Sequence, residues 1–176
     1  MKPALPAETG LAPAARSVVM CLIRGSQHGL EDDPLLSIHE LQLDTGLPEE
    51  SLVDAAFELE ERGLVRLRRD LNVGPAGFDL VRPTARLFVA FDPFAMTWSP
   101  EVDALQIAVR LVSSGEGALV QTLAKDFCWS TRRINPAITY LEEHDLVQVS
   151  EMTSPPYARH CIFPNERTRR WVKSKS

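Results

Sequence analysis

The chain has 176 residues, of which 44% are hydrophobic and 24% are charged, and its formal net charge is −5. This composition is typical of a folded globular protein, and no run of about 18 apolar residues is present to cross a membrane. The three cysteines lack paired spacing, so we expect reduced thiols in a cytoplasmic protein.

The first elements along the chain are predicted to be helices with defined ends. PAARSVVMCLIR is apolar and stops at Gly25, which predicts a first helix. Ser37 and Glu40 have the spacing of a capping box, in which each side chain satisfies a backbone N–H of the other residue. The helix that they start, SIHELQLDT, is expected to end at Gly46.

The stretch PEESLVDAAFELEERGLV, at Pro48 to Val65, predicts a third helix that leads into a strand. Its buried stripe is expected to consist of small and branched apolar residues: Leu52, Ala55, Ala56 and Leu59. LVRLRRDLNV and FDLVRP then flank a Gly/Pro turn at residues 74–77, which predicts a hairpin. TARLFVAFD, after Pro83, is expected to be helical, and residues 92–100 are expected to form a linker.

The same order of elements recurs in the second half. Ser99 and Pro100 open a predicted helix that closes at Gly115, and ALVQTLAKDF forms the next. The third, STRRINPAITYLEEHDLV at residues 130–147, nearly copies the stretch 82 residues earlier, with a predicted stripe of Ile134, Ala137, Ile138 and Leu141. A second hairpin follows, and NERTRRWVK after Pro164 matches TARLFVAFD at an offset of 81. Pro136 either kinks the third helix or occupies its first position after Asn135.

A helix that feeds a short strand in this way resembles the recognition helix and first wing strand of the winged helix-turn-helix superfamily. The resemblance implies a mainly α fold with small β wings (α+β), built as two tandem winged helix-turn-helix domains at residues 1–98 and 99–176. The alternative is one all-helical domain in which two LEE..LV stretches are similar by coincidence.

Charge distinguishes the two halves. Residues 1–98 contain 9 basic and 15 acidic side chains, whereas residues 99–176 contain 10 and 9. The predicted recognition helix of the first half directs Glu49, Glu50, Asp54 and Glu58 outward, and DNA would repel these carboxylates. We therefore expect this half to hold a dimer or a protein partner. Arg66, Arg68 and Arg69 on the wing strand either touch phosphates or pair with these acids.

The second half is the candidate DNA-binding domain. Arg132 and Asn135 are predicted to contact guanine and adenine, because their side chains match the hydrogen-bonding edges of these bases. Ser130 is expected to cap the helix beside an exposed Thr131, and Arg133 to reach a phosphate. The remaining predicted DNA contacts lie on the wing and at the basic end of the chain: Arg159, His160, Arg167, Arg169 and Arg170.

The resemblance implies a transcription regulator that binds duplex DNA as a homodimer. The alternative is a protein-interaction subunit similar to the tandem winged-helix subunits of bacterial chromosome-condensation complexes. No phosphate loop, paired catalytic carboxylates or nucleophile elbow occurs in the sequence, so we do not expect an enzyme. The histidines and cysteines lack metal-ligand spacing, and we expect no metal or other cofactor.

Overall fold

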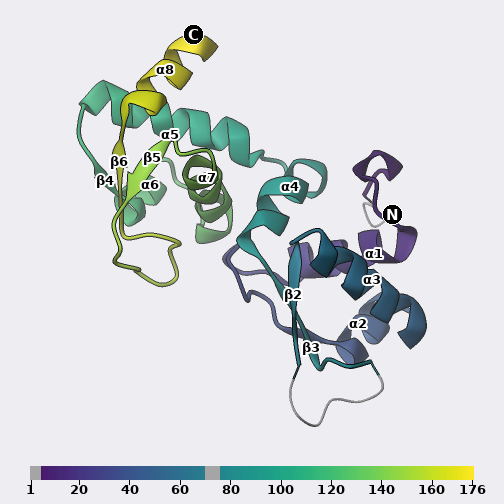
Figure 1. Cartoon of the computed structure of the whole chain (residues 1–176). Helices are drawn as coiled ribbons and strands as arrows, with labels where there is room; N and C mark the ends of the chain where they lie inside the picture. The colour runs from purple at the N-terminus through teal and green to yellow at the C-terminus, as the bar shows by residue number, and fades with distance from the viewer. Residues whose placement is uncertain (1–4, 70–75) are drawn as a thin grey trace. The chain divides into compact units, whose positions relative to one another are not determined.

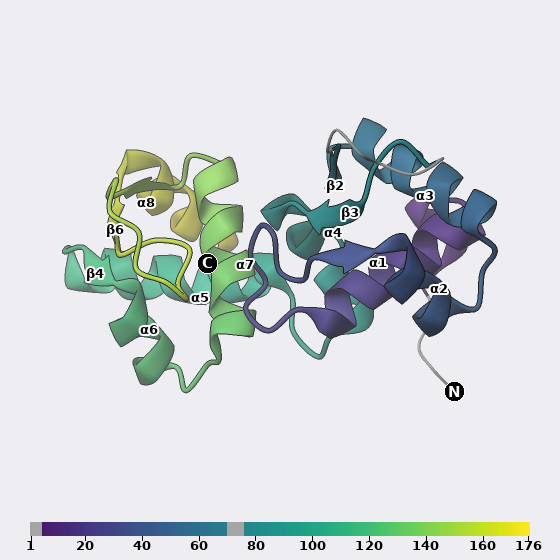
Figure 2. The same cartoon turned by 90° about the horizontal axis from the view of Figure 1, so that it is seen from below.

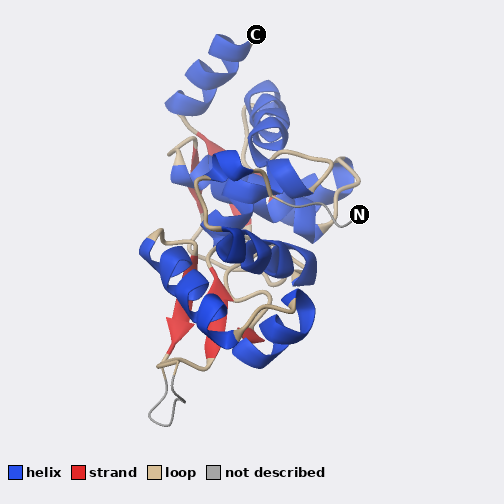
Figure 3. Cartoon of the chain, turned by 90° about the vertical axis from the view of Figure 1, so that its right-hand side faces the viewer, coloured by secondary structure: helices blue, strands red, loops and turns tan. Residues whose placement is uncertain are grey.

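The computed structural model describes residues 5–69 and 76–176, and the chain divides into two compact units, Met1–Met96 and Thr97–Ser176. Both units are mainly helical, and each contains one small three-stranded antiparallel sheet (Figures 1 and 3). The fold class predicted from the sequence, mainly α with small β elements, is confirmed.

The first unit begins with a 3₁₀ turn and then alternates helices with short strands. Its elements are α1 (Pro13–Gly25), β1 (Leu36–Ser37), α2 (Ile38–Thr45), α3 (Glu49–Glu61), β2 (Val65–Arg68), β3 (Leu80–Pro83) and α4 (Ala85–Ala95). The sheet order is β1-β3-β2, and α1 packs against α2, α3 and α4. Leu22, Leu59 and Phe88 are fully buried in the core between these elements.

Two helix ends in this unit form as their residues predict. The hydroxyl of Ser37 accepts a hydrogen bond from the backbone N–H of Glu40, and the Glu40 carboxylate accepts one from the backbone N–H of Ser37, which completes the capping box of α2. Gly46 ends α2 with φ 70°, a left-handed conformation in which a side chain would be strained. Pro48 is the N-cap residue of α3, and the first helical residue is Glu49.

Some of the predicted boundaries are wrong. Helix α4 continues through Pro93 to Ala95, into the expected linker, and it buries Phe91 and Asp92. Strand β1 was not predicted, because two residues are too few to show an alternating pattern. The predicted turn of the first hairpin, at residues 74–77, lies partly outside the described residues.

The second unit has the same order of helices and strands. Its elements are α5 (Pro100–Ser114), β4 (Ala118–Leu119), α6 (Val120–Asp126), α7 (Thr131–Glu143), β5 (Val147–Val149), β6 (Cys161–Pro164) and α8 (Glu166–Lys175). The sheet order is β4-β6-β5, and α5 packs against α7 and α8. Ile107, Leu111, Ile134 and Ile138 are fully buried between these helices.

The two units also match in detail. Helix α2 begins at Ile38 and α6 at Val120, 82 residues later, and the same offset separates the starts of α3 and α7. All the residues of the two predicted apolar stripes are buried. Left-handed backbone also recurs at this offset: Gly46 and Gly63 in the first unit correspond to Cys128 (φ 54°) and Asp145 (φ 52°) in the second.

Helix α7 begins at Thr131 and continues through Pro136, so the alternative start at Asn135 is wrong. Of the helices in the described part of the chain, none is long and apolar enough to cross a membrane.

Candidate nucleic-acid interface

The two residues predicted to read DNA bases are both buried. Asn135 has no exposed surface, and Arg132 is only 7% exposed. A base edge must reach a side chain directly to be recognised by it. The prediction that these residues lie on the outer face of α7 is therefore wrong.

The connection between β5 and β6 explains the burial of Asn135. The side-chain amide nitrogen of Asn135 donates to the carbonyl oxygen of Pro156 at 2.9 Å, and its amide oxygen accepts from the backbone N–H of Ala158 at 3.0 Å. Figure 2 shows this connection turning back toward α7 from the two strands. Asn135 thus fastens the hairpin connection to the helix.

Arg133 joins α7 to α5 instead of projecting freely toward a phosphate. Its guanidinium donates two hydrogen bonds of 2.7 Å to the carboxylate of Asp103, which is fully buried. These hydrogen bonds to Asp103 raise the pKa of Arg133, and an arginine side chain is charged at any physiological pH. The guanidinium also lies 4.3 Å from the ring centroid of Trp129, which stacks on Phe127 at 4.5 Å. These three contacts, made in series from Asp103 to Phe127, hold the turn before α7 in place.

The two residues at the start of α7, Ser130 and Thr131, do not have the roles predicted for them. Ser130 is exposed at the N-cap position, but its hydroxyl makes no capping hydrogen bond, so the predicted side-chain cap is absent. Thr131 is half-buried and not exposed.

The predicted contacts on the second hairpin connection also point toward the protein. Arg159 is half-buried and forms a two-bond ion pair with Glu142 of α7, and this pairing raises the pKa of Arg159. His160 is half-buried, and its backbone N–H donates to the carbonyl oxygen of Met152. Arg159 thus supports the hairpin connection in the same way as Asn135.

The strongest concentration of exposed positive charge lies on α8. This helix contains one acid, Glu166, and five basic residues: Arg167, Arg169, Arg170, Lys173 and Lys175. Arg169 and Arg170 share Glu166 at distances of 3.5 and 3.4 Å, and the side chain of Arg170 is 79% exposed. Arg167 pairs with Asp145, and Lys175 with Glu101, in exposed contacts. Ion pairs at such exposed positions are weak, so these cations remain able to meet a polyanion.

The outer surface of α3 in the first unit is acidic. Glu49, Glu50, Asp54 and Glu61 are exposed, as is Phe57 at 39%. Glu58 is instead half-buried: it pairs with Arg62 and accepts a hydrogen bond from the backbone N–H of Ala12. This surface would repel DNA, as the sequence predicts.

The arginines of the first hairpin pair with acids, which answers a question that the sequence left open. Four ion pairs connect the strands and the residue after β2 to carboxylates of the same unit: Arg66–Glu31, Arg68–Asp79, Arg69–Glu60 and Arg82–Asp32. The arginine hydrogen bonds lower the pKa of Asp79 and of Glu60. Each of these arginines has a carboxylate of its own, so the pairs in the described part of the hairpin add no net positive charge.

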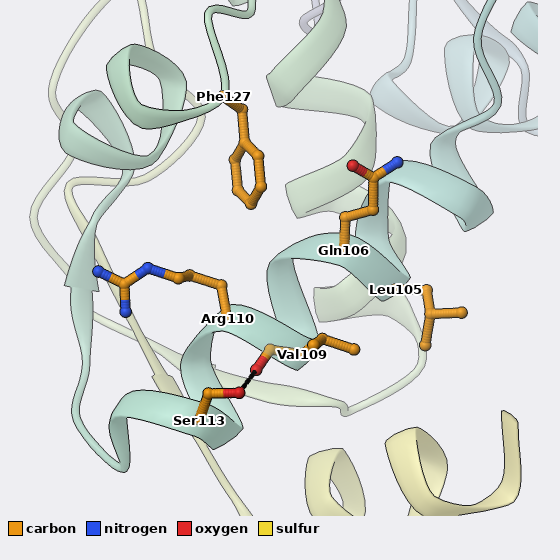
Figure 4. Close-up of a pocket in the computed structure, with 6 residues that line it drawn as sticks. All are labelled: Leu105, Gln106, Val109, Arg110, Ser113 and Phe127. Atoms are coloured by element: carbon orange, nitrogen blue, oxygen red, sulfur yellow. Dashed lines mark hydrogen bonds between the residues drawn. The ribbon is translucent and has the colours of Figure 1, made fainter. Parts of the chain in front are cut away.

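Sequence reasoning missed a groove of about 480 Å³ on the outer face of α5 (Figure 4). It is lined by Leu105, Gln106, Val109, Arg110 and Ser113 of α5 and by Phe127, just after α6. A second apolar stripe runs along this helix through Val102, Leu105 and Val109. The helical spacing of these residues in the sequence could have predicted the apolar surface of the groove. Val102 is 56% exposed and Val109 44%, so the stripe is not covered by the second unit's own core.

Among residues 5–69 and 76–176, no three histidine, cysteine, aspartate or glutamate side chains are grouped to hold a metal ion. A comparison with models of known protein families finds no match, and a comparison with curated protein sequences finds none either.

Proposed function

We propose that this chain is a non-enzymatic, cytoplasmic DNA-binding regulator of the winged-helix type, and that it acts as a homodimer. Its second unit contacts duplex DNA through the phosphate backbone, mainly with α8. The observation that supports this contact is the cluster of five basic side chains on α8 beside a single acid. Contact through Arg132 and Asn135 is not part of the proposal, since both are buried.

Phosphate contact by α8 has a physical signature that base reading lacks. Each lysine or arginine that neutralises a phosphate releases counterions, so the affinity falls steeply as salt rises. Contacts of this kind position a protein on the duplex without selecting a sequence. We therefore expect binding to duplexes of unrelated sequence with similar affinity at low salt.

The decisive experiment compares two double variants that remove the same charge from the full chain. Arg170→Gln with Lys173→Gln alters exposed cations of α8, whereas Arg66→Gln with Arg86→Gln alters exposed cations of the first unit. Binding to a random duplex is measured by fluorescence anisotropy at several salt concentrations. The α8 variant should lose affinity, and its salt slope should fall by about 1 for each lost phosphate contact.

The control variant should bind as the unaltered chain does, because it leaves α8 intact although its change in net charge is the same. Equal losses in both variants would indicate a general charge effect and would overturn the assignment to α8. No salt-sensitive binding by the unaltered chain would remove the DNA-binding proposal itself.

A second candidate function is a protein-interaction subunit similar to those of bacterial chromosome-condensation complexes. The acidic outer surface of α3 with an exposed Phe57 favours it, because exposed carboxylates and an exposed apolar side chain on one helix suit a basic protein partner better than DNA. Co-purification with a coiled-coil ATPase or its linker protein, lost in Phe57→Ser and retained in Phe94→Ser, would support this function. Phe94 is a fair control because it is also exposed, at 49%.

A further inference from the structure

We propose that the groove between α5 and Phe127 is a binding site for a small aromatic carboxylate. The site is independent of the DNA-binding proposal, because none of its lining residues belongs to α8 and because it can be tested without DNA. Its volume, about 480 Å³, lies within the range of roughly 300–1,000 Å³ that is usual for small-molecule sites.

The walls of the groove specify an apolar, flat ligand. Leu105 and Val109 supply aliphatic surface along α5, and Phe127 points toward this helix from the other side (Figure 4). Phe127 is half-buried, with its ring fixed by stacking on Trp129 at an interplanar angle of 19°. A fixed aromatic ring opposite aliphatic side chains favours an aromatic body, which can stack or meet the ring edge-on.

The polar groups at the rim specify the charge of the ligand. Arg110 and Gln106 lie on opposite sides of the groove in Figure 4, and the hydroxyl of Ser113 donates to the carbonyl oxygen of Val109. The guanidinium of Arg110 is 3.9 Å from Asp126, too far for a hydrogen bond, and its side chain is 52% exposed. It can therefore form a two-bond contact with a carboxylate that enters the groove.

Binding is tested on the full chain by an NMR titration with 2-naphthoate, with the neutral 2-naphthamide as the comparison ligand. Naphthoate should shift the signals of Val109, Ser113 and Phe127 and bind about tenfold more tightly than the amide, as expected for one charge-assisted contact. Arg110→Gln should abolish this preference. Asp126→Asn should strengthen naphthoate binding, because it removes the acid that competes for Arg110.

Two matched substitutions on the same helix separate the groove from the rest of the surface. Val109→Asp should abolish binding, whereas Val102→Asp should leave it unchanged, because Val102 is exposed on α5 but does not line the groove. The proposal is overturned if naphthoate shifts no groove signal at millimolar concentration, if both valine variants lose binding equally, or if naphthamide binds as well as naphthoate.

Discussion

Asn135 is a structural residue, and its substitution should destabilise the second unit. Asn135→Ala leaves the carbonyl oxygen of Pro156 and the N–H of Ala158 without their side-chain partner and creates a small space in the interior. We expect a loss of about 1–3 kcal/mol in the free energy of unfolding, measured by urea denaturation. Gln148→Ala, at an exposed position of β5, should change it by less than about 0.5 kcal/mol. Equal effects of the two substitutions would contradict the role given to Asn135.

Cys128 occupies a backbone conformation that suits glycine better. Its φ of 54° brings its Cβ close to backbone atoms, and the corresponding residue of the first unit is Gly46. Cys128→Gly should therefore raise the free energy of unfolding by about 1 kcal/mol. Cys128→Val should lower it, because a β-branched residue tolerates this conformation least. Thermal unfolding measures both changes in the free energy of unfolding. A glycine variant less stable than the unaltered chain would show that the thiol contributes more to stability than the backbone strain costs.

Helix α2 should lose part of its stability in acid through its capping box. The backbone and hydroxyl hydrogen bonds from Ser37 lower the pKa of Glu40. A carboxyl whose pKa is lowered on folding stabilises the protein above its unfolded pKa, and this contribution disappears as the pH falls through the folded pKa. Glu40→Ala should thus destabilise the chain at pH 7, and the difference from the unaltered chain should be smaller at pH 3.

Glu61→Ala is the control for this pH dependence, since Glu61 is an exposed residue at the end of α3. Urea denaturation at both pH values measures the differences. A Glu40→Ala effect of equal size at pH 3 and pH 7 would mean that the side chain stabilises α2 without its charge.

Sequence patterns predicted where the helices lie but not which of their polar side chains are exposed. The stripe spacing located α3 and α7 and their buried residues, because one apolar face recurs every three or four residues. It assigned Arg132 and Asn135 to the outside, because the spacing contains no sign of a chain segment folding over the opposite face. The partners of Asn135 lie 21 and 23 residues away, beyond the reach of any local pattern.

The candidate site was least predictable where it depends on pairing between elements. The sequence predicted a basic end of the chain, and Arg169 and Arg170 are exposed there on α8. It did not indicate that Asp103 binds Arg133 or that Glu142 binds Arg159, because each pair joins residues from different elements. Two-residue strands such as β4 also escaped prediction for lack of a repeat.

At the scale of the molecule, the two hydrophobic cores share no residue, so each unit should unfold in its own transition. All three tryptophans, Trp98, Trp129 and Trp171, belong to the second unit. Tryptophan fluorescence should therefore follow the second unit alone, whereas far-UV circular dichroism follows both.

Variants of each core test this independence. Leu59→Ala removes a fully buried side chain of the first core. It should shift the unfolding transition of the first unit, which circular dichroism detects, and leave the fluorescence transition of the second unit unchanged. Asn135→Ala should shift the transition seen by fluorescence. If Leu59→Ala moves the fluorescence midpoint as far as the dichroism midpoint, the chain unfolds as one cooperative body.

The strained position of Cys128 has a practical consequence. Its thiol is exposed, while Cys21 is buried and Cys161 is half-buried, so a maleimide dye should label Cys128 first. The dye would be attached beside Phe127. The turn there is held by the stacking of Phe127 on Trp129 and by the contacts of Arg133 with Trp129 and Asp103. Its emission would then report on whatever enters the neighbouring groove, without any engineered cysteine.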